Sequence, residues 1–275
     1  MARGDVLITP DELDGVLADV DLLDVRWRLG EPSGAGRDRY REAHLPGARF
    51  LDLETVLTRH GEPTDGRHPL PDADTLARGL GALGVDGSRP IVVYDEAGSF
   101  AAARAWWVLR WAGLGVRVLD GGVDAWAAHN RPMTTGDVIV DKAELHVTPG
   151  RLPTIEADDA AGFSGTLMDA RAPERYRGET EPMDPVAGHI PGAVNVPVSG
   201  FFAADGRLPE QDRLRELLGD RTAPLAAYCG SGVSAAQLVL AGAALDLEIA
   251  LYPGSWSAWS NDPSRPVATG ESEPA

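Results

Sequence analysis

The stretch Leu225-Ala226-Ala227-Tyr228-Cys229-Gly230-Ser231-Gly232-Val233-Ser234-Ala235 decides the fold of the second half of the chain. An apolar run of strand length is followed by a glycine-containing loop, and then by an apolar run of helix length. A buried strand followed by a helix is the repeating unit of parallel sheets that carry helices on both faces. The stretch therefore predicts an α/β domain with this loop at the carboxyl end of a strand, where such sheets bind ligands.

Helix and strand patterns alternate along the rest of the chain as well. A helix is predicted to begin after Thr9, where Pro10 occupies the first turn and Glu12 completes a capping box. Apolar runs of strand length and runs of helix length then follow one another. The predicted strands are 22–27, 91–95, 116–119, 166–170, 225–228 and 248–252, and the predicted helices are 99–112, 211–218, 233–245 and one near residue 156.

Matching motifs recur in the same order in the two halves of the chain. The run LLDVR at 22–26 is matched by LMDAR at 167–171, and HLPGA at 44–48 is matched by HIPGA at 189–193. Ordered repeats of this kind indicate two copies of one domain. We therefore predict two tandem α/β domains. The region between the copies, 131–153, is rich in Pro, Gly and polar residues and contains one strand-like stretch at 138–140. The predicted ranges are 1–140 for the first domain, 141–155 for the linker and 156–275 for the second domain.

Composition excludes several classes of function. The chain has 275 residues, 43% of them hydrophobic, and a net charge of −17. A strongly acidic surface repels phosphate backbones and anionic lipids, so we expect no binding to nucleic acid or membranes. The first residues lack the basic and apolar regions of a secretory signal, which favours a cytoplasmic location. One cysteine excludes internal disulfides and multi-cysteine metal sites, and no pattern implies a metal or an organic cofactor.

Cys229 is the candidate nucleophile. Gly230 and Gly232 allow the loop to curl tightly and to direct backbone N–H groups toward the sulfur. The following helix directs the positive end of its dipole to the same place, and Ser234 stands at its start as a cap. This environment stabilises a thiolate or persulfide anion. The alternative, a small buried hydrophobic residue, is disfavoured by the position of Cys229 between a strand and a glycine-containing loop.

Asp95 occupies the place of Cys229 in the first copy. A carboxylate does not form a persulfide, so we expect the first domain to be catalytically silent. Two rival cysteine chemistries need partners that are missing after Cys229. A phosphatase loop requires an arginine where Ala235 stands, and a disulfide oxidoreductase requires a second cysteine where Gly232 stands.

The loop resembles the active loop of two-domain rhodaneses and 3-mercaptopyruvate sulfurtransferases. The duplication, the two His-x-Pro-Gly-Ala motifs, GRHPLP at 66–71 and GSWSAW at 254–259 are similar to that family too. The resemblance implies two tandem rhodanese-like domains and a thiolate that takes sulfur from a small donor as a persulfide. An external acceptor, a thiol or cyanide, or a thioredoxin-like reductant, would then remove it. The implied site comprises Cys229 and the loop residues Gly230, Ser231, Gly232, Val233 and Ser234.

The sulfur donor is left open by the sequence. Neutral residues after the cysteine resemble the mercaptopyruvate type more than the thiosulfate type, which carries basic residues there. The mercaptopyruvate type also places two arginines on its substrate, and Arg175 matches the first. The second is expected directly after Glu181-Pro182, but Met183 and Asp184 stand there. Arg177 is a candidate replacement.

Several further residues have a structural and a functional interpretation. Arg26 and Arg171 occur in both copies and are interpreted as structural ion-pair partners. His44 is interpreted first as a residue that fixes a turn. The resemblance gives it a second hypothesis, a serine–histidine–aspartate arrangement with Ser231 and Asp38.

A second class of function also fits the residues. A persulfide carrier would load Cys229 and deliver sulfur to a protein partner, with little turnover of small donors. Comparison of thiosulfate with 3-mercaptopyruvate in a cyanide-dependent assay separates the enzyme from the carrier.

Overall fold

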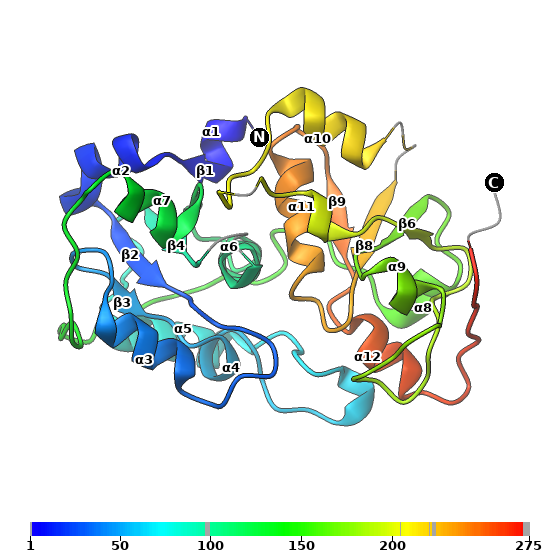
Figure 1. Ribbon diagram of the computed structural model, residues 1–275. Helices are drawn as coiled ribbons and strands as arrows, with labels where there is room; N and C mark the ends of the chain where they lie inside the picture. Colours follow the sequence, from blue (N-terminus) through cyan, green and yellow to red (C-terminus); the bar gives the residue numbers. More distant parts are fainter. Residues whose placement is uncertain (1, 97–99, 204, 220, 222–223, 272–275) are drawn as a thin grey trace. The chain divides into compact units, whose positions relative to one another are not determined.

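The chain forms two compact units in the computed structural model (Figure 1). The structure describes residues 2–96, 100–203, 205–219, 221 and 224–271. Most of the first half of the sequence lies in unit 1 and most of the second half in unit 2. One segment of the first half, His60–Leu70, packs with unit 2. Unit 1 comprises Met1–Arg59, Pro71–Leu152 and Phe202–Leu208, and unit 2 comprises His60–Leu70, Pro153–Phe201 and Pro209–Ala275.

Unit 1 contains a sheet in which every described pair of strands is parallel. The strands, in spatial order, are β1 (Leu7–Ile8), β5 (Val116–Leu119), β4 (Ile91–Tyr94), β2 (Asp21–Asp24) and β3 (Arg49–Phe50). The helices are α1 (Arg3–Val6), α2 (Pro10–Val16), α3 (Ala35–Glu42), α4 (Leu53–Val56), α5 (Ala73–Ala82), α6 (Phe100–Trp111) and α7 (Gly122–Ala128), with a 3-10 turn η1 (Leu17–Asp19).

Unit 2 repeats this plan. Its described strands, in spatial order, are β7 (Val194–Asn195), β6 (Thr166–Asp169), β8 (Leu225–Tyr228) and β9 (Ile249–Leu251), again all parallel. The helices are α8 (Ala157–Ala161), α9 (Pro173–Tyr176), α10 (Gln211–Leu218), α11 (Ala235–Ala243) and α12 (Ser255–Ser260), with 3-10 turns η2 (Pro63–Asp65) and η3 (Val198–Gly200).

The two sheets have corresponding strand orders. Strands β5, β4, β2 and β3 of unit 1 follow one another as β9, β8, β6 and β7 do in unit 2. The place of β1 is taken by a single parallel bridge between Thr154 and Leu251. The predicted fold class, two α/β domains of one type, is therefore confirmed.

Buried apolar strands explain why both sheets form. All four residues of β4 and of β8 are buried, as expected for strands covered on both faces. Helix α6 packs on β4 and β5, and α11 packs on β8 and β9. Thr9 caps α2 through the predicted capping box.

Buried ion pairs occupy equivalent positions in the two units. Arg26 donates to Asp24 at 2.8 Å, and Arg171 donates to Asp169 at 2.6 Å. Both arginines are nearly inaccessible, with exposed fractions of 6% and 3%. The structural interpretation of this repeated Asp-x-Arg motif is therefore confirmed.

Some local predictions differ from the structure. Residues 138–140 are not part of a strand, because they make no ladder bonds.

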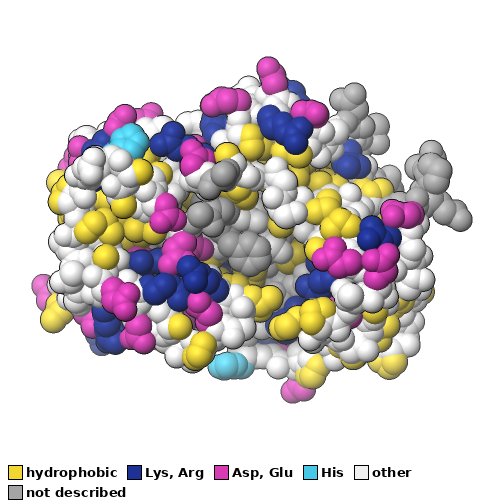
Figure 2. Space-filling model, in the orientation of Figure 1, with side chains coloured by type: hydrophobic (Ala, Val, Ile, Leu, Met, Phe, Trp, Pro, Cys, Tyr) yellow, Lys and Arg dark blue, Asp and Glu magenta, His cyan; other side chains and the backbone are white. Residues whose placement is uncertain are grey.

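On the face shown in Figure 2, arginine side chains lie among carboxylates instead of forming a continuous basic patch. Arg39, for example, contacts both Glu31 and Glu96. Within the part of the chain that the structure describes, no helix has the length and apolar character needed to span a bilayer.

Candidate active site

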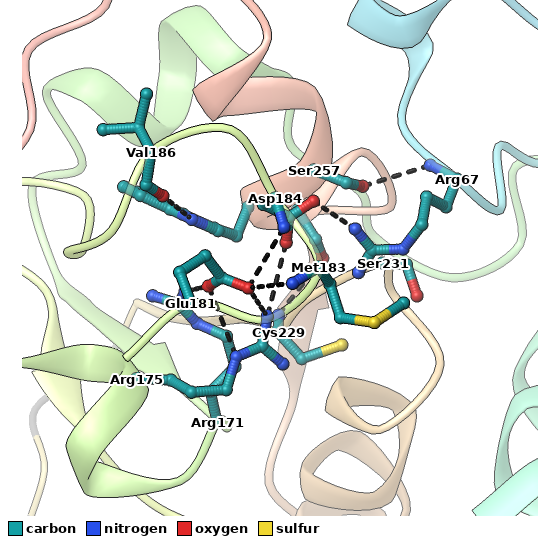
Figure 3. Close-up of polar contacts among 12 residues, drawn as sticks. Arg67, Arg171, Arg175, Glu181, Met183, Asp184, Val186, Cys229, Ser231 and Ser257 are labelled. Atoms are coloured by element: carbon teal, nitrogen blue, oxygen red, sulfur yellow. Dashed lines mark hydrogen bonds and ion pairs between the residues drawn. The ribbon is translucent and has the colours of Figure 1, made fainter. Parts of the chain in front are cut away.

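The loop after β8 is fixed to the start of α12 by backbone bonds. The N–H of Cys229 donates to Ser255 Oγ at 3.1 Å, and its carbonyl oxygen accepts from the Trp256 N–H at 2.9 Å. The carbonyl of Gly230 accepts from the Ser257 N–H, also at 2.9 Å. These bonds fix the backbone of the loop that carries Cys229 and Ser231. Both residues are labelled in Figure 3.

The sulfur of Cys229 faces a backbone donor from its own loop. The N–H of Gly232 donates to Cys229 Sγ at 3.1 Å. Gly232 has a φ of +75°, and a Cβ at this position would lie 2.5 Å from the carbonyl oxygen of Pro253. Glycine is therefore required here both by the backbone conformation and by the close approach of Pro253. The resulting turn aims an amide at the place where negative charge would reside on sulfur.

Ser231 forms a close pair with a histidine that the sequence analysis did not select. Ser231 Oγ lies 2.8 Å from Nδ1 of His68, and their exposed fractions are 6% and 7%. His68 comes from the segment His60–Leu70, which belongs to unit 2 with Ser231. The sequence contained a sign of it, because His68 lies inside the GRHPLP motif. The motif indicates the family but does not by itself single out His68 as a site residue.

His44 has a different environment. Its Nδ1 lies 2.8 Å from the carbonyl oxygen of Tyr40, and the two rings stack with centroids 4.2 Å apart. Asp38, the third member of the hypothesis, is 73% exposed and contacts Arg41. The imidazole on Ser231 is that of His68, so the structure corrects the pairing of Ser231 with His44 and Asp38.

His189 supports the structural interpretation of His44. Its Nδ1 lies 2.8 Å from the carbonyl oxygen of Tyr176, and those two rings also stack. Burial lowers the pKa of His189, although its bond to the Tyr176 carbonyl acts in the opposite direction. The two histidines of the repeated HxPGA motif thus fix the same turn in each unit.

Two guanidinium groups lie over the loop next to Cys229. A Cβ built on Gly230 would lie 3.0 Å from Nη2 of Arg67 and 3.5 Å from Nη1 of Arg175. Arg175 comes from α9, and Arg67 adjoins His68 in the segment His60–Leu70. The second arginine beside the loop is therefore Arg67.

Arg177 does not take that role. It donates to Glu179 at 2.7 Å, and Glu179 is 56% exposed. Arg177 also contacts Glu271 near the end of the described chain. The hypothesis that Arg177 replaces the missing second arginine is corrected, because its guanidinium is engaged in this peripheral ion pair.

Two carboxylates already contact the arginines of the site. Arg175 Nη2 donates to Glu181 at 2.6 Å and to Asp184 at 3.3 Å, and Arg67 donates to the other oxygen of Asp184 (Figure 3). The Asp184 side chain is only 2% exposed. Burial raises the pKa of Asp184, although Arg67 opposes this change.

Glu181 also organises the turn that carries Asp184. Its Oε1 accepts from the N–H groups of Met183 and Asp184, at 3.0 and 3.2 Å. Arg171 reaches Glu181 at 3.3 Å and lies over the ring of Trp256 at 4.6 Å. The buried Arg171–Asp169 pair thereby connects β6 with the arginine–carboxylate group.

The loop continues into α11 through Val233 and Ser234. Val233 is 2% exposed. Ser234 stands at the N-cap position of α11, but its side chain makes no capping bond. The interpretation of Ser234 as a side-chain cap is therefore wrong. Trp256 and Trp259 of the GSWSAW motif are buried.

Asp95 follows β4 of unit 1 as Cys229 follows β8 of unit 2. Its carboxylate accepts from the N–H groups of Glu96, at 2.7 Å, and Ala101, at 2.8 Å. Burial raises the pKa of Asp95 to about 7. The predicted helix start at residue 99 lies outside the described residues.

The site in unit 2 combines a cysteine at a strand end, an amide on its sulfur, a serine–histidine pair and two arginines. Among the described residues, no group of His, Cys, Asp and Glu side chains is arranged to hold a metal ion. A parallel α/β domain with this site defines the class of cysteine-dependent group-transfer enzymes.

The sequence matches the rhodanese-like domain over residues 9–129 and 155–262. The chain therefore belongs to the rhodanese family and is a sulfurtransferase. It is 45% identical over 282 residues to SseB of Mycobacterium tuberculosis, provisionally named a thiosulfate sulfurtransferase, covering 98% of this chain and 99% of that protein.

Two further comparisons agree with this assignment. A Pseudomonas aeruginosa protein named a probable 3-mercaptopyruvate sulfurtransferase is 44% identical over 285 residues, covering 96% of this chain and 98% of that protein. The crystal structure of SseA from Escherichia coli, titled as a 3-mercaptopyruvate sulfotransferase, matches with a TM-score of 0.81 and 31% identity. That match covers 91% of this chain and 98% of the other.

Proposed function

We propose that the chain moves sulfur from 3-mercaptopyruvate, through a persulfide on Cys229, to an external thiol or to cyanide. The observation that carries the choice of donor is the 2.8 Å contact between Ser231 Oγ and His68 Nδ1, two residues from the nucleophile. A hydroxyl that is hydrogen-bonded to an imidazole can transfer a proton, and the mercaptopyruvate reaction requires a proton transfer.

The first half-reaction balances without a redox cofactor. The Cys229 thiolate attacks the thiol sulfur of 3-mercaptopyruvate, an S–S bond forms, and the bond from carbon 3 to sulfur breaks. The electron pair of that bond remains on the leaving fragment, which is the enolate of pyruvate. The proton of the donor thiol passes through Ser231 and His68 to carbon 3, which yields pyruvate and a Cys229 persulfide anion.

The reaction with thiosulfate does not require this proton transfer. Attack on its outer sulfur releases sulfite, a stable anion that leaves without being protonated. A serine–histidine pair beside the sulfur therefore adds nothing to the thiosulfate reaction but directly serves the mercaptopyruvate reaction. The names of the similar proteins include both donors.

The second half-reaction requires an acceptor from outside the chain. Cys229 is the only cysteine of the sequence, so no second thiol of the chain can attack the persulfide. Cys229 is 1% exposed, which favours an acceptor with a compact reacting group, such as a thiol or cyanide. We further propose a cytoplasmic location and regeneration by a thioredoxin-like reductant. Asp95 gives unit 1 no sulfur nucleophile at the equivalent position.

The experiment compares the two donors at equal concentration with cyanide as the acceptor, and measures thiocyanate together with pyruvate or sulfite. We expect a higher kcat/KM with 3-mercaptopyruvate. The variant His68→Gln should lower kcat with 3-mercaptopyruvate by about a hundredfold, the usual scale of a lost proton-transfer group, and should affect thiosulfate much less. An equal loss with both donors would refute the proton route. Negligible product from either donor would favour the persulfide carrier.

A further inference from the structure

The arginines beside Cys229 are already bound to carboxylates of the chain itself. Asp184 contacts Arg67 with one oxygen and Arg175 with the other, so it bridges the two guanidinium groups (Figure 3). A bridging carboxylate on two arginines is the arrangement that a bound anionic donor would adopt. Asp184 belongs to the chain, however, and with Met183 it stands where the family resemblance leads one to expect the second substrate arginine.

The charges of this group cancel. Arg67 and Arg175 carry two positive charges, and Glu181 and Asp184 carry two negative charges. Glu181 has a structural task, because it binds Arg171 and accepts from two backbone N–H groups. Among the described residues, the side chain of Asp184 forms ion pairs with Arg67 and Arg175. Removal of the Asp184 carboxylate therefore changes the charge of the site and disturbs the turn less than removal of the Glu181 carboxylate would.

Arg67 retains capacity for another partner. Within the described part of the chain, its Nε is buried and has no hydrogen-bond partner. Buried donors of this kind are usually satisfied in a functioning protein. The Nε of Arg67 therefore indicates that Asp184 binds the guanidinium group but leaves one of its hydrogen-bond donors without an acceptor among the described residues.

We propose that Asp184 determines which donors the enzyme accepts, by occupying the two arginines and thereby weakening the binding of small anions, dianions most of all. This inference rests on the proposed function. Thiosulfate carries two negative charges and 3-mercaptopyruvate carries one carboxylate. The Coulomb repulsion from Asp184 grows with the charge of the donor, and the neutralised arginines no longer offset it. The residue thus acts against thiosulfate more strongly than against 3-mercaptopyruvate.

The variant Asp184→Asn tests this inference, because it removes the charge and keeps the shape and one acceptor oxygen. We expect KM for thiosulfate to fall by about tenfold or more, which corresponds to about 1.4 kcal/mol. We expect a smaller fall for 3-mercaptopyruvate and little change in kcat for either donor. The ratio of the two kcat/KM values should therefore shift toward thiosulfate.

The matched control is Glu179→Gln. It removes one negative charge from an ion pair of the same unit, the pair with Arg177, and Glu179 is not part of the site. A shift in the donor ratio that is equal in Asp184→Asn and Glu179→Gln would overturn the inference, since net charge alone would then explain it. An unchanged ratio in Asp184→Asn would overturn it as well.

A second measurement keeps this test separate from the proposed function. Sulfate and pyruvate, a dianion and a monoanion, are used to protect Cys229 from alkylation by iodoacetamide. Asp184→Asn should make sulfate protect at about tenfold lower concentration, with a smaller change for pyruvate. If the enzyme turns over neither donor, the proposed function is wrong. Protection of Cys229 from alkylation then tests the role of Asp184 by itself. Asp184→Ser serves in the same way if Asp184→Asn unfolds.

Discussion

At the scale of single residues, the environment of Cys229 is buried but polar. The sulfur accepts from Gly232, and the guanidinium groups of Arg67 and Arg175 lie over the adjacent Gly230. A cysteine that merely filled space would be surrounded by apolar side chains. The Gly232 N–H therefore stabilises negative charge on the Cys229 sulfur, whether it is a thiolate or a persulfide.

Gly232 offers a direct test of that amide. In Gly232→Ala the new Cβ would have to fit against the Pro253 carbonyl, at a φ that disfavours side chains. The turn must shift, so the N–H of residue 232 no longer points at the Cys229 sulfur. We therefore expect kcat/KM to fall by about a hundredfold or more.

The control for this variant is Gly192→Ala. Gly192 has a φ of +82°, and nothing lies within 4 Å of its added Cβ, so it shares the backbone strain without the close contact. Both variants should lose about 1–2 kcal/mol of stability from the left-handed backbone conformation, while only Gly232→Ala should lose the activity. Equal kinetics for the two variants, measured by cyanide-dependent turnover, would show that the Gly232 amide is not needed.

At the scale of secondary structure, the side chain of Ser255 joins elements that carry the site. Ser255, the first residue of α12, has a φ of +53° and binds both the Cys229 N–H and the Tyr252 carbonyl. Its side chain thus joins the end of β9 to the end of β8. A non-glycine residue in this conformation persists only where its surroundings enforce it.

Ser255→Ala should therefore destabilise unit 2. It leaves the buried N–H of Cys229 without its partner, at a cost of about 1–3 kcal/mol in the free energy of unfolding. Urea denaturation measures this loss. Ser264→Ala is the control, because Ser264 Oγ makes one exposed bond, to Asp262, and its removal should cost much less. A loss no greater than that of the control would contradict the assigned role of Ser255.

Sequence patterns predicted the larger elements and missed what depends on tertiary packing. Strand 116–119, helix 211–218 and strand 225–228 have the predicted bounds. The two-residue strands β1, β3 and β7 are too short to produce a periodic pattern. The positions of Arg67 and His68 beside the loop were not predicted, because they depend on where the distant segment His60–Leu70 packs.

At the scale of the whole molecule, the two units share a fold but carry different residues after the corresponding strands β4 and β8. Unit 2 has Cys229 after its central strand, and unit 1 has Asp95, a buried carboxylate that accepts from the N–H groups of Glu96 and Ala101. Ionising a carboxylate in such a place costs free energy, which is why burial raises its pKa to about 7.

Asp95 should therefore make stability depend on pH. In the unfolded chain it ionises near its ordinary pKa of 3.8, whereas in the folded chain it stays protonated until about pH 7. Stability is lost as pH rises through this window, because the folded state then binds more protons than the unfolded state. Asp95→Asn removes the effect, so the variant should gain on the order of 2–4 kcal/mol relative to wild type between acidic pH and pH 8.

Unfolding free energies of wild type and Asp95→Asn at several pH values check this prediction. Asp124→Asn is a control, because it removes a carboxylate of unit 1 that is exposed. A difference between wild type and Asp95→Asn that stays constant across the window would mean that Asp95 ionises normally.

The most direct test of the account is mass spectrometry of the protein after exposure to 3-mercaptopyruvate and removal of the excess donor. The account predicts a gain of one sulfur atom on the peptide that contains Cys229, its loss on addition of cyanide, and no gain in Cys229→Ser. Continued turnover by Cys229→Ser, or pyruvate release by wild type with no sulfur on Cys229, would contradict the account.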